Sequence, residues 1–372
     1  MGKKLTSPVL IIEGGTQDAD LRYASGFTAP DPVVLLVAGR RKYLVVSLLE
    51  YGRAKATAKV SAVFTPEQLD LGGRDRGRLS AWAYALLKKL NYRKVTVGAA
   101  FPVGAAEQLR QRGFRVMVTD ALLFPGRRRK TESEVRQIAA TQRAAVAAMR
   151  AAMEAIRCAS VDVRGYLRGR DKRRLRAEDV RRVIDRTLLD HDCMADETIV
   201  ACGAQGADPH ERGHGPLRAG QPIVIDIFPR HKVSGYWGDI TRTVVKGEPT
   251  PVAARMIRAV RAAQAAALQV IRAGVSVKRV HETAQRVLIA HGFETTVRDG
   301  RGEGFIHSTG HGIGLQIHEA PSLNLSGTRL IAGDVITVEP GLYYRQWGGV
   351  RFEDTVVVTR SGCRRLARCP AE

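Results

Sequence analysis

The chain has 372 residues, more than one ordinary hydrophobic core accommodates, which predicts two domains. Its hydrophobic content of 44% is typical of a globular protein, and it lacks the run of about 18 apolar residues that a membrane-spanning helix needs, so no membrane partner is expected. The net charge of +22 is most simply explained as a solvated basic surface, with attraction to polyanions as the alternative. The basic clusters lack interleaved aromatic residues, so we expect nucleic-acid binding to be weak and non-specific if it occurs at all.

The cysteine pattern and the N-terminal segment bear on the compartment. The apolar stretch of residues 8–12 is too short for a signal-peptide core, so no secretory signal is expected. The cysteines have no CxxC spacing and no paired pattern, which is typical of reduced thiols in a cytoplasmic protein: Cys158, Cys193, Cys202, Cys363 and Cys369.

Residues 1–125 alternate between strand and helix patterns. Two apolar runs, residues 33–38 and 43–47, flank a turn and predict a β-hairpin. Residues 79–90 have the apolar spacing of a helix, residues 94–101 follow as a strand, and residues 105–114 form a second helix that ends near Gly113. This order predicts a small α/β domain.

A Pro-Gly pair and a basic run near residues 125–130 mark a domain boundary. Thr131 and Glu134 then have the spacing of a capping box, which predicts the start of a long helix that reaches about Cys158. Three more helices are expected, at residues 177–189, 252–273 and 277–291. Strands are expected at residues 197–203, 222–228, 238–245, 316–319, 335–343 and 351–359. Two helices followed by antiparallel strands therefore occur twice, which indicates an internal repeat.

Four carboxylates and one imidazole in or beside these strands are the most informative feature of the sequence: Asp226, Asp239, His311, Glu339 and Glu353. Taken alone, Asp226 is most simply explained as a structural residue bonded to a turn amide. Burying four carboxylates together is unfavourable, however, unless positive charge neutralises them. Two divalent metal ions supply that charge, and this ligand set suits Mn, Fe, Co or Zn.

The histidines divide into two groups. His307 and His311 have the i, i+4 spacing of a helical zinc pair, but the glycines around them oppose a helix and indicate a loop that enters a strand. Only His311 then needs to be a ligand, and His307 and His318 face a cleft or are ordinary core histidines. His210 and His214 lie in a loop just before the first acidic strand, and the sequence alone does not choose between them.

The segments GHGIGLQIHE, VITVEPGLY and WGGVRFEDTVVVT resemble the pita-bread metallopeptidases, which include methionine aminopeptidases, aminopeptidase P, prolidase and creatinase. The five ligand types occur in the order of that family. LRYASGF and the YLVVS hairpin resemble the N-terminal domain of the proline-directed and creatinase branch. The resemblance implies an α/β N-terminal domain over residues 1–128. It also implies an α+β pita-bread catalytic domain over residues 129–372, with a curved antiparallel sheet and a pseudo-twofold repeat.

The resemblance also implies roles for individual residues. Asp226 would chelate one metal, Asp239 and Glu353 would bridge both metals, and His311 and Glu339 would complete the second site. Glu339 would also shuttle the proton, together with three catalytic histidines: His210, His307 and His318.

Three further residues would bind the substrate. Arg351 would face a product carboxylate, and Trp347 and Tyr343 would shape the pocket for the proline ring.

The loop after Asp226 departs from the family, because it is two residues longer than expected and replaces the usual glycine with the sequence IFPR. This difference concerns the shape of the cleft more than the metal ligands.

The expected function is hydrolysis of the bond between an N-terminal residue and proline in short peptides, by a homodimer with two divalent ions, manganese first among Mn, Co, Zn and Fe. Hydrolysis of another small amide on the same metal pair is the second candidate. Creatinase-type hydrolysis without metal and an RNA-binding role remain as alternatives, but the complete ligand set opposes both.

Overall fold

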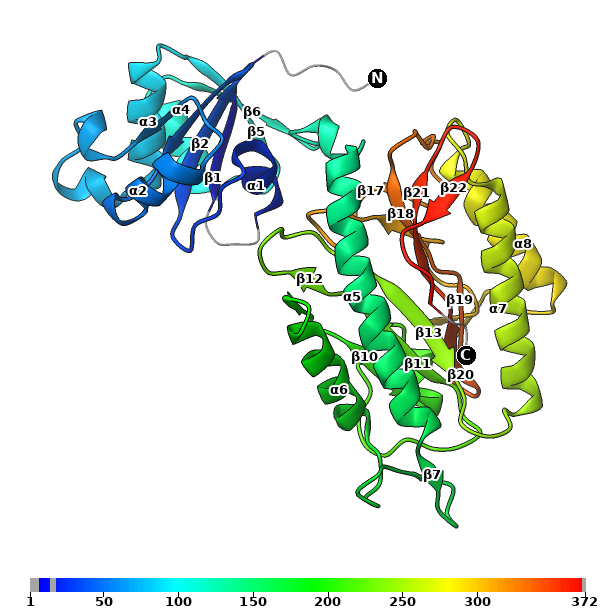
Figure 1. The fold of residues 1–372 in the computed structure, drawn as a ribbon. Helices are drawn as coiled ribbons and strands as arrows, with labels where there is room; N and C mark the ends of the chain where they lie inside the picture. Colours follow the sequence, from blue (N-terminus) through cyan, green and yellow to red (C-terminus); the bar gives the residue numbers. More distant parts are fainter. Residues whose placement is uncertain (1–6, 14–17, 370–372) are drawn as a thin grey trace. The chain divides into compact units, whose positions relative to one another are not determined.

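The structure is a computed structural model that describes residues 7–13 and 18–369 (Figure 1). The chain divides into two compact units, Met1–Arg127 and Arg128–Glu372. No helix among the described residues is both long enough and apolar enough to cross a membrane.

The first unit contains a mixed six-stranded sheet, in the order β4-β3-β2-β1-β5-β6. Its strands are β1 (Val9–Glu13), β2 (Val33–Ala38), β3 (Arg41–Val45), β4 (Ala62–Phe64), β5 (Lys94–Gly98) and β6 (Arg115–Thr119). Its α-helices are α1 (Ala19–Ser25), α2 (Leu48–Thr57), α3 (Leu79–Lys89) and α4 (Val103–Gln111). β2 and β3 form the predicted hairpin, with Ala38 opposite Arg41, and the α/β prediction for this region is confirmed.

The second unit is built from two similar halves. Each half begins with a pair of packed helices, first α5 (Glu132–Arg157) with α6 (Ala177–Leu189) and then α7 (Pro251–Val270) with α8 (Val277–Ala290). Figure 1 shows α5 and α6 against one set of strands and α7 and α8 beside the other. The predicted repeat of two helices followed by strands is therefore confirmed.

All strand pairs of the second unit are antiparallel among the described residues. The first half contains the sheet β10 (Ile199–Cys202), β11 (Ile223–Ile227) and β13 (Ile240–Val244). The second contains the sheet β17 (Glu319–Ser322), β16 (His311–Gly312), β18 (Val335–Val338), β21 (Asp354–Val358) and β22 (Cys363–Arg365). Four two-stranded pairs complete the second unit among the described residues: β7 (Ser160–Val161) with β8 (Leu167–Arg168), β9 (Cys193–Met194) with β12 (Arg230–His231), β14 (Thr296–Arg298) with β15 (Arg301–Glu303), and β19 (Gly341–Tyr344) with β20 (Gly348–Arg351).

The helix that opens the second unit begins as its sequence predicts. Thr131 Oγ1 accepts a hydrogen bond from the Glu134 backbone N–H, and the Glu134 carboxylate accepts one from the Thr131 N–H at 2.8 Å. This capping box satisfies two N–H groups that the first turn of a helix leaves without partners.

Three of the predicted strands differ from the structure. Gln316–His318 is an irregular bend, and strand β17 starts only at Glu319. The predicted strands at residues 335–343 and 351–359 are each interrupted, at Glu339-Pro340 and at Phe352-Glu353. Pro340 explains the first interruption, because proline has no N–H for the ladder.

Candidate metal centre and active-site cavity

Strand pairing within each half brings the predicted acidic ligands together. In the first half, β11 pairs with β13 so that Asp226 lies opposite Thr241, and Asp239 lies directly before β13. In the second half, Glu339 and Glu353 occupy the two strand interruptions. The backbone N–H of Glu353 donates to the carbonyl of Thr241 at 3.0 Å, which joins the two halves at the site.

Asp239, His311 and Glu353 form a group suited to hold a cation, since one ligand atom from each lies within 4.8 Å of the others. His311 Nε2 lies 3.6 Å from Asp239 Oδ2 and 3.3 Å from Glu339 Oε1. Nδ1 of His311 lies 3.1 Å from the Gly312 carbonyl. Because a carbonyl can only accept, Nδ1 carries the proton and the lone pair of Nε2 faces the carboxylates, as in histidines that bind metals.

Burial makes this group unfavourable without a cation. Desolvation, with the nearby Glu353 and Asp226 carboxylates, raises the pKa of Asp239 well above its usual range. Desolvation, with Glu339 and Asp226, likewise raises the pKa of Glu353. The pKa of Glu339 is raised mainly by desolvation.

Two carboxylate oxygens in this group are buried without a hydrogen-bond partner among the described residues, Asp226 Oδ1 and Glu353 Oε1. A buried, unsatisfied oxygen is costly, and a metal bond satisfies it. The donor set of one imidazole and four carboxylates, with these two orphaned oxygens, therefore fits divalent cations.

Threonines hold two further carboxylate oxygens of the group. Thr241 Oγ1 donates to Glu353 Oε2 at 2.7 Å, and Thr337 Oγ1 donates to Glu339 Oε1 at 3.0 Å. Sequence reasoning missed both threonines. Strand alternation could have indicated them, because Thr337 lies two residues before Glu339 and so shares its face of the strand.

The group opens into a cavity of about 1040 Å³. His210, His307 and His318 all line this cavity, together with the five predicted ligands. His214, which the sequence could not separate from His210, does not line it and instead lies 3.7 Å from Glu211. The ring of His318 meets that of His311 edge-on, with centroids 4.3 Å apart.

His307 is held on both ring nitrogens. Nδ1 lies 2.7 Å from the Ser308 carbonyl, to which it must donate, so Nε2 accepts from the Tyr343 hydroxyl at 2.9 Å. Burial lowers the pKa of His307, which favours this neutral form. His307 therefore lines the cavity with its hydrogen bonds already made inside the protein.

Of the three residues predicted to bind substrate, Arg351 lines the cavity, whereas Tyr343 and Trp347 are absent from its lining. Tyr343 is only 1% exposed, behind the cavity wall, and burial raises the pKa of its hydroxyl to about 12. Trp347 lies in the turn between β19 and β20, packs against Tyr344 and borders a separate hollow.

Arg351 reaches the cavity wall, but its side chain is occupied by protein partners. It donates to Asp226 Oδ2 at 2.6 Å, to the Tyr343 hydroxyl at 2.7 Å and to Thr241 Oγ1 at 3.1 Å. These contacts connect a predicted metal ligand with the hydroxyl that holds His307. Arg351 is thus placed to orient the centre.

A second ion pair adjoins the cavity and was not predicted. Lys130 Nζ donates to Glu319 Oε1, and both side chains are almost fully buried. Glu319 lines the cavity next to His318. The pair fixes the end of the irregular segment that places His318 beside His311.

Comparison with known proteins gives the family. A model described as metallopeptidase family M24 matches residues 136–360, and one described as the creatinase/prolidase N-terminal domain matches residues 9–123. The chain belongs to metallopeptidase family M24. Membership in this metallopeptidase family agrees with the need for divalent cations that the buried carboxylates show.

Two curated M24 relatives show the extent of the sequence match. The chain is 36% identical over 178 residues to an Xaa-Pro dipeptidase of Pyrococcus furiosus, covering 47% of this chain and 48% of the relative. It is 39% identical over 180 residues to a probable dipeptidase PepE of Mycobacterium bovis, covering 47% of this chain and 44% of that protein. The chain thus spans about half the length of these curated relatives.

Solved M24 structures match over nearly the whole chain. The prolidase from Pyrococcus furiosus aligns with a TM-score of 0.79 and 26% identity, over 98% of this chain and 97% of that one. The prolidase from Pyrococcus horikoshii aligns with a TM-score of 0.81 and 26% identity, over 98% and 95%. The expected fold, an α/β N-terminal domain followed by a pita-bread domain, is confirmed.

Proposed function

We propose that this M24 protein hydrolyses the bond between an N-terminal residue and proline in short peptides, with two divalent cations bound by Asp226, Asp239, His311, Glu339 and Glu353. The observation that supports this most is the buried ligand group in the 1040 Å³ cavity, where two carboxylate oxygens have no hydrogen-bond partner among the described residues and a cation would satisfy them. The named prolidase and dipeptidase relatives support the proline preference.

Bound cations would supply an activated water and would stabilise the oxyanion that develops on the scissile carbonyl. Glu339 is our candidate for the group that passes a proton to the leaving nitrogen, because its carboxylate lines the cavity beside His311. Thr337 fixes its orientation through Oε1.

The cavity histidines would act on the substrate. His318 projects beside His311 without a hydrogen-bond partner among the residues described, so it is available to bond the substrate carbonyl or the tetrahedral intermediate. His210 lies on the exposed side of the cavity and would contact the other end of a short peptide. His307 would act mainly through its bond to Tyr343.

The apolar walls of the cavity provide a place for the proline ring. They come from both halves of the unit: Ile199, Pro209, Phe228, Ile306 and Ile317. Proline offers no N–H in an Xaa-Pro bond, so the enzyme must recognise it by shape. We assign this role to these residues rather than to Trp347 and Tyr343. Phe228 belongs to the IFPR segment, so the unusual loop contributes directly to the cavity.

Manganese is proposed as the native metal, because carboxylate-rich sites favour the harder cations of its series. The five free cysteines support a cytoplasmic location. A homodimer is proposed from the resemblance to the proline-directed branch.

Activity assays on the metal-stripped protein test the proposal. Xaa-Pro dipeptides and Xaa-Pro-Xaa tripeptides would be compared with matched Xaa-Ala peptides after adding Mn, Co or Zn. We expect metal-dependent release of the N-terminal residue from the proline peptides, with little cleavage of the alanine peptides. Equal cleavage of both sets would favour the second candidate, a metal-dependent hydrolase of other small amides or peptides.

A further inference from the structure

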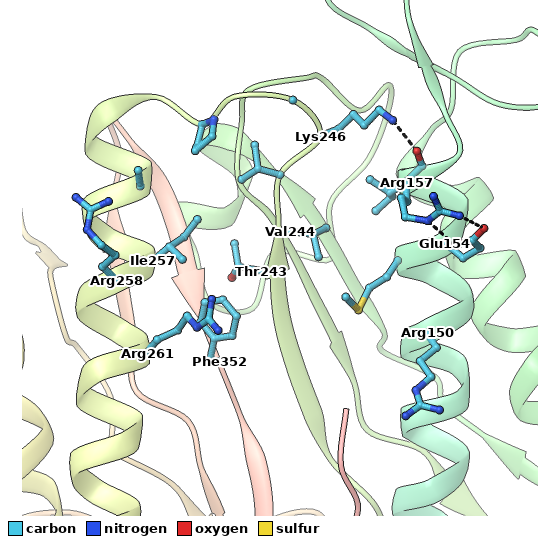
Figure 2. A pocket seen from close by; sticks show the side chains of 16 residues that line it. Arg150, Glu154, Arg157, Thr243, Val244, Lys246, Ile257, Arg258, Arg261 and Phe352 are labelled. Atoms are coloured by element: carbon cyan, nitrogen blue, oxygen red, sulfur yellow. Dashed lines mark hydrogen bonds and ion pairs between the residues drawn. The ribbon is translucent and has the colours of Figure 1, made fainter. Parts of the chain in front are cut away.

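A second cavity lies in the same unit and shares no lining residue with the metal site. It has a volume of about 750 Å³ and lies between α5 and α7, over the end of β13 (Figure 2). We call it the helix groove. Its length corresponds to about two helical turns, from Arg150 to Arg157 on α5 and from Ala254 to Arg261 on α7.

The helix groove lies behind the metal centre. Arg351 and Glu353 line the active-site cavity, whereas Phe352, the residue between them, lines the groove. Successive side chains of an extended chain point to opposite faces. The two cavities therefore lie on opposite faces of one segment of backbone.

The floor of the helix groove is apolar. It consists mainly of aliphatic side chains and one buried aromatic ring: Met153, Ile156, Val244, Val245, Pro249, Ala254, Ile257 and Phe352. Figure 2 shows Val244 and Ile257 facing the space between the two helices. An aliphatic surface of this kind gains free energy when an apolar group covers it.

The rim of the helix groove is strongly basic. Five cationic side chains line it: Arg150, Arg157, Lys246, Arg258 and Arg261. Among the described residues one acidic side chain lines the groove, Glu154, which accepts hydrogen bonds from Arg157 at 2.7 and 2.8 Å. The groove therefore presents an excess of positive charge around an apolar floor.

Several of these cations are already oriented by the protein. Lys246 Nζ donates to the Arg157 carbonyl at 2.5 Å, and Arg150 donates to the Arg368 carbonyl at 3.3 Å. The guanidinium of Arg261 lies 5.8 Å from the centre of the Phe352 ring. These contacts reduce the conformational entropy that the side chains would lose on binding an anion.

We propose that the helix groove binds an amphiphilic organic anion, meaning a molecule with an apolar body and a terminal carboxylate or phosphate. The apolar body would cover the aliphatic floor, and the head group would meet the basic rim. The volume is in the range of small-molecule sites, roughly 300–1,000 Å³. Charge complementarity with the rim selects an anion over a neutral molecule or a cation.

Two other anionic ligands fit the groove less well. A single-stranded nucleic acid needs accessible aromatic rings for base stacking, whereas Phe352 is only 3% exposed and lies beside Arg261. Inorganic phosphate would leave the apolar floor uncovered. Both become outcomes of the test.

Isothermal titration calorimetry of the full-length protein tests the proposal, with five probes and with each amphiphile kept below its critical micelle concentration. Laurate and dodecyl phosphate distinguish a carboxylate from a phosphate head group, and dodecyltrimethylammonium, inorganic phosphate and a short oligonucleotide are the controls. We expect saturable binding of one or both amphiphilic anions and none of the controls. Binding of the cationic amphiphile with similar affinity would overturn the proposal, as would equally tight binding of inorganic phosphate or of a short oligonucleotide.

Three variants locate the site. Arg258→Glu should weaken binding by about tenfold or more, because a charge-assisted contact becomes repulsive. Ala254→Trp should block the apolar floor without changing the charge. Arg255→Glu is the matched control, because Arg255 is an exposed arginine on the same helix outside the groove lining, and it should bind like the wild type.

Melting curves establish that each variant is folded. Unchanged binding in both the charge variant and the filled variant would place the ligand elsewhere and refute the proposal. The test is independent of the peptidase assignment, because it measures binding at residues outside the metal site.

Discussion

Arg351 shows how a residue predicted to contact substrate can instead organise the site. Its guanidinium donates to Asp226, Tyr343 and Thr241, so three of its five N–H groups are already bonded within the protein. Replacing it with alanine would leave a buried carboxylate without its charged partner, which is a large penalty. The residue therefore connects metal binding with the orientation of His307.

We predict that Arg351→Ala lowers kcat and weakens metal binding, with equal effects on dipeptides and on longer Xaa-Pro peptides. Tyr343→Phe is the control, since it keeps Arg351 and Asp226 together but removes the hydroxyl that holds His307. Steady-state kinetics and metal titration of both variants provide the measurement. A rise in KM confined to dipeptides would restore the alternative role, recognition of a product carboxylate.

The roles of Glu339 and His318 can be distinguished by measuring metal binding in a variant of each residue. We expect Glu339→Gln to lose nearly all turnover and to bind metal more weakly, because both a ligand charge and a proton acceptor are lost. His318→Ala should retain metal and lower kcat by roughly 10²–10⁴-fold if it assists proton transfer or the intermediate. Metal content and kcat measured on the same preparations decide this, and wild-type kcat in either variant would refute its assignment.

The metal ligands themselves could be predicted from the sequence, but the side chains that hydrogen-bond and orient those ligands could not. Asp226 and Glu353 stand out because a carboxylate in an apolar run is costly. Thr241 and Arg351 do not stand out in this way, because their role depends on contacts across 110 residues of chain. Trp347 fits a proline pocket by residue type alone, and only its packing on Tyr344 at a separate hollow shows that it lies outside the cavity lining.

At the scale of elements, the helices were predictable because their signals are local. The capping box of Thr131 lies at the predicted start of α5. Helix α6 begins at Ala177, as the sequence predicts. The interruptions at Glu339 and Phe352-Glu353 were missed, because the apolar pattern continues through them. In both places the backbone hydrogen bonding of the strand is interrupted at the residue whose carboxylate points to the metal centre.

The start of α5 gives an element-scale prediction. Thr131→Ala should destabilise the protein by about 1 kcal/mol, because the cap hydrogen bond is lost. That corresponds to a fall in melting temperature of roughly 2–4 °C for a unit of this size. Thr131→Ser keeps the hydroxyl and should melt like the wild type in the same calorimetric scan. Equal losses in both variants would show that packing of the threonine methyl, rather than capping, matters there.

At the scale of the whole molecule, the second unit depends on its cations. The pKa values of Asp239 and Glu353 are raised because desolvation and neighbouring carboxylates oppose their charge. Metal-free protein must therefore either protonate these groups or tolerate their repulsion. A bound cation removes that cost in the folded state only.

We predict that adding Mn²⁺ to the metal-stripped protein raises its melting temperature. A free metal concentration of about 100 times Kd stabilises by about 2.7 kcal/mol per site, which is roughly 5–10 °C for a unit of this size. Fluorescence of Trp237, whose indole N–H donates to the Leu315 carbonyl near the site, would report the transition.

The double variant Asp239→Asn/Glu353→Gln distinguishes metal binding by these carboxylates from the repulsion between them in the metal-free protein. It should show no Mn²⁺ shift, because two ligand charges are gone. Without metal it should melt at or above the stripped wild type, because the buried negative charges that oppose folding have been removed. A stripped variant that melts well below the stripped wild type would show that these carboxylates stabilise the metal-free fold. An unchanged wild-type melting curve after verified metal removal would refute the metal centre itself.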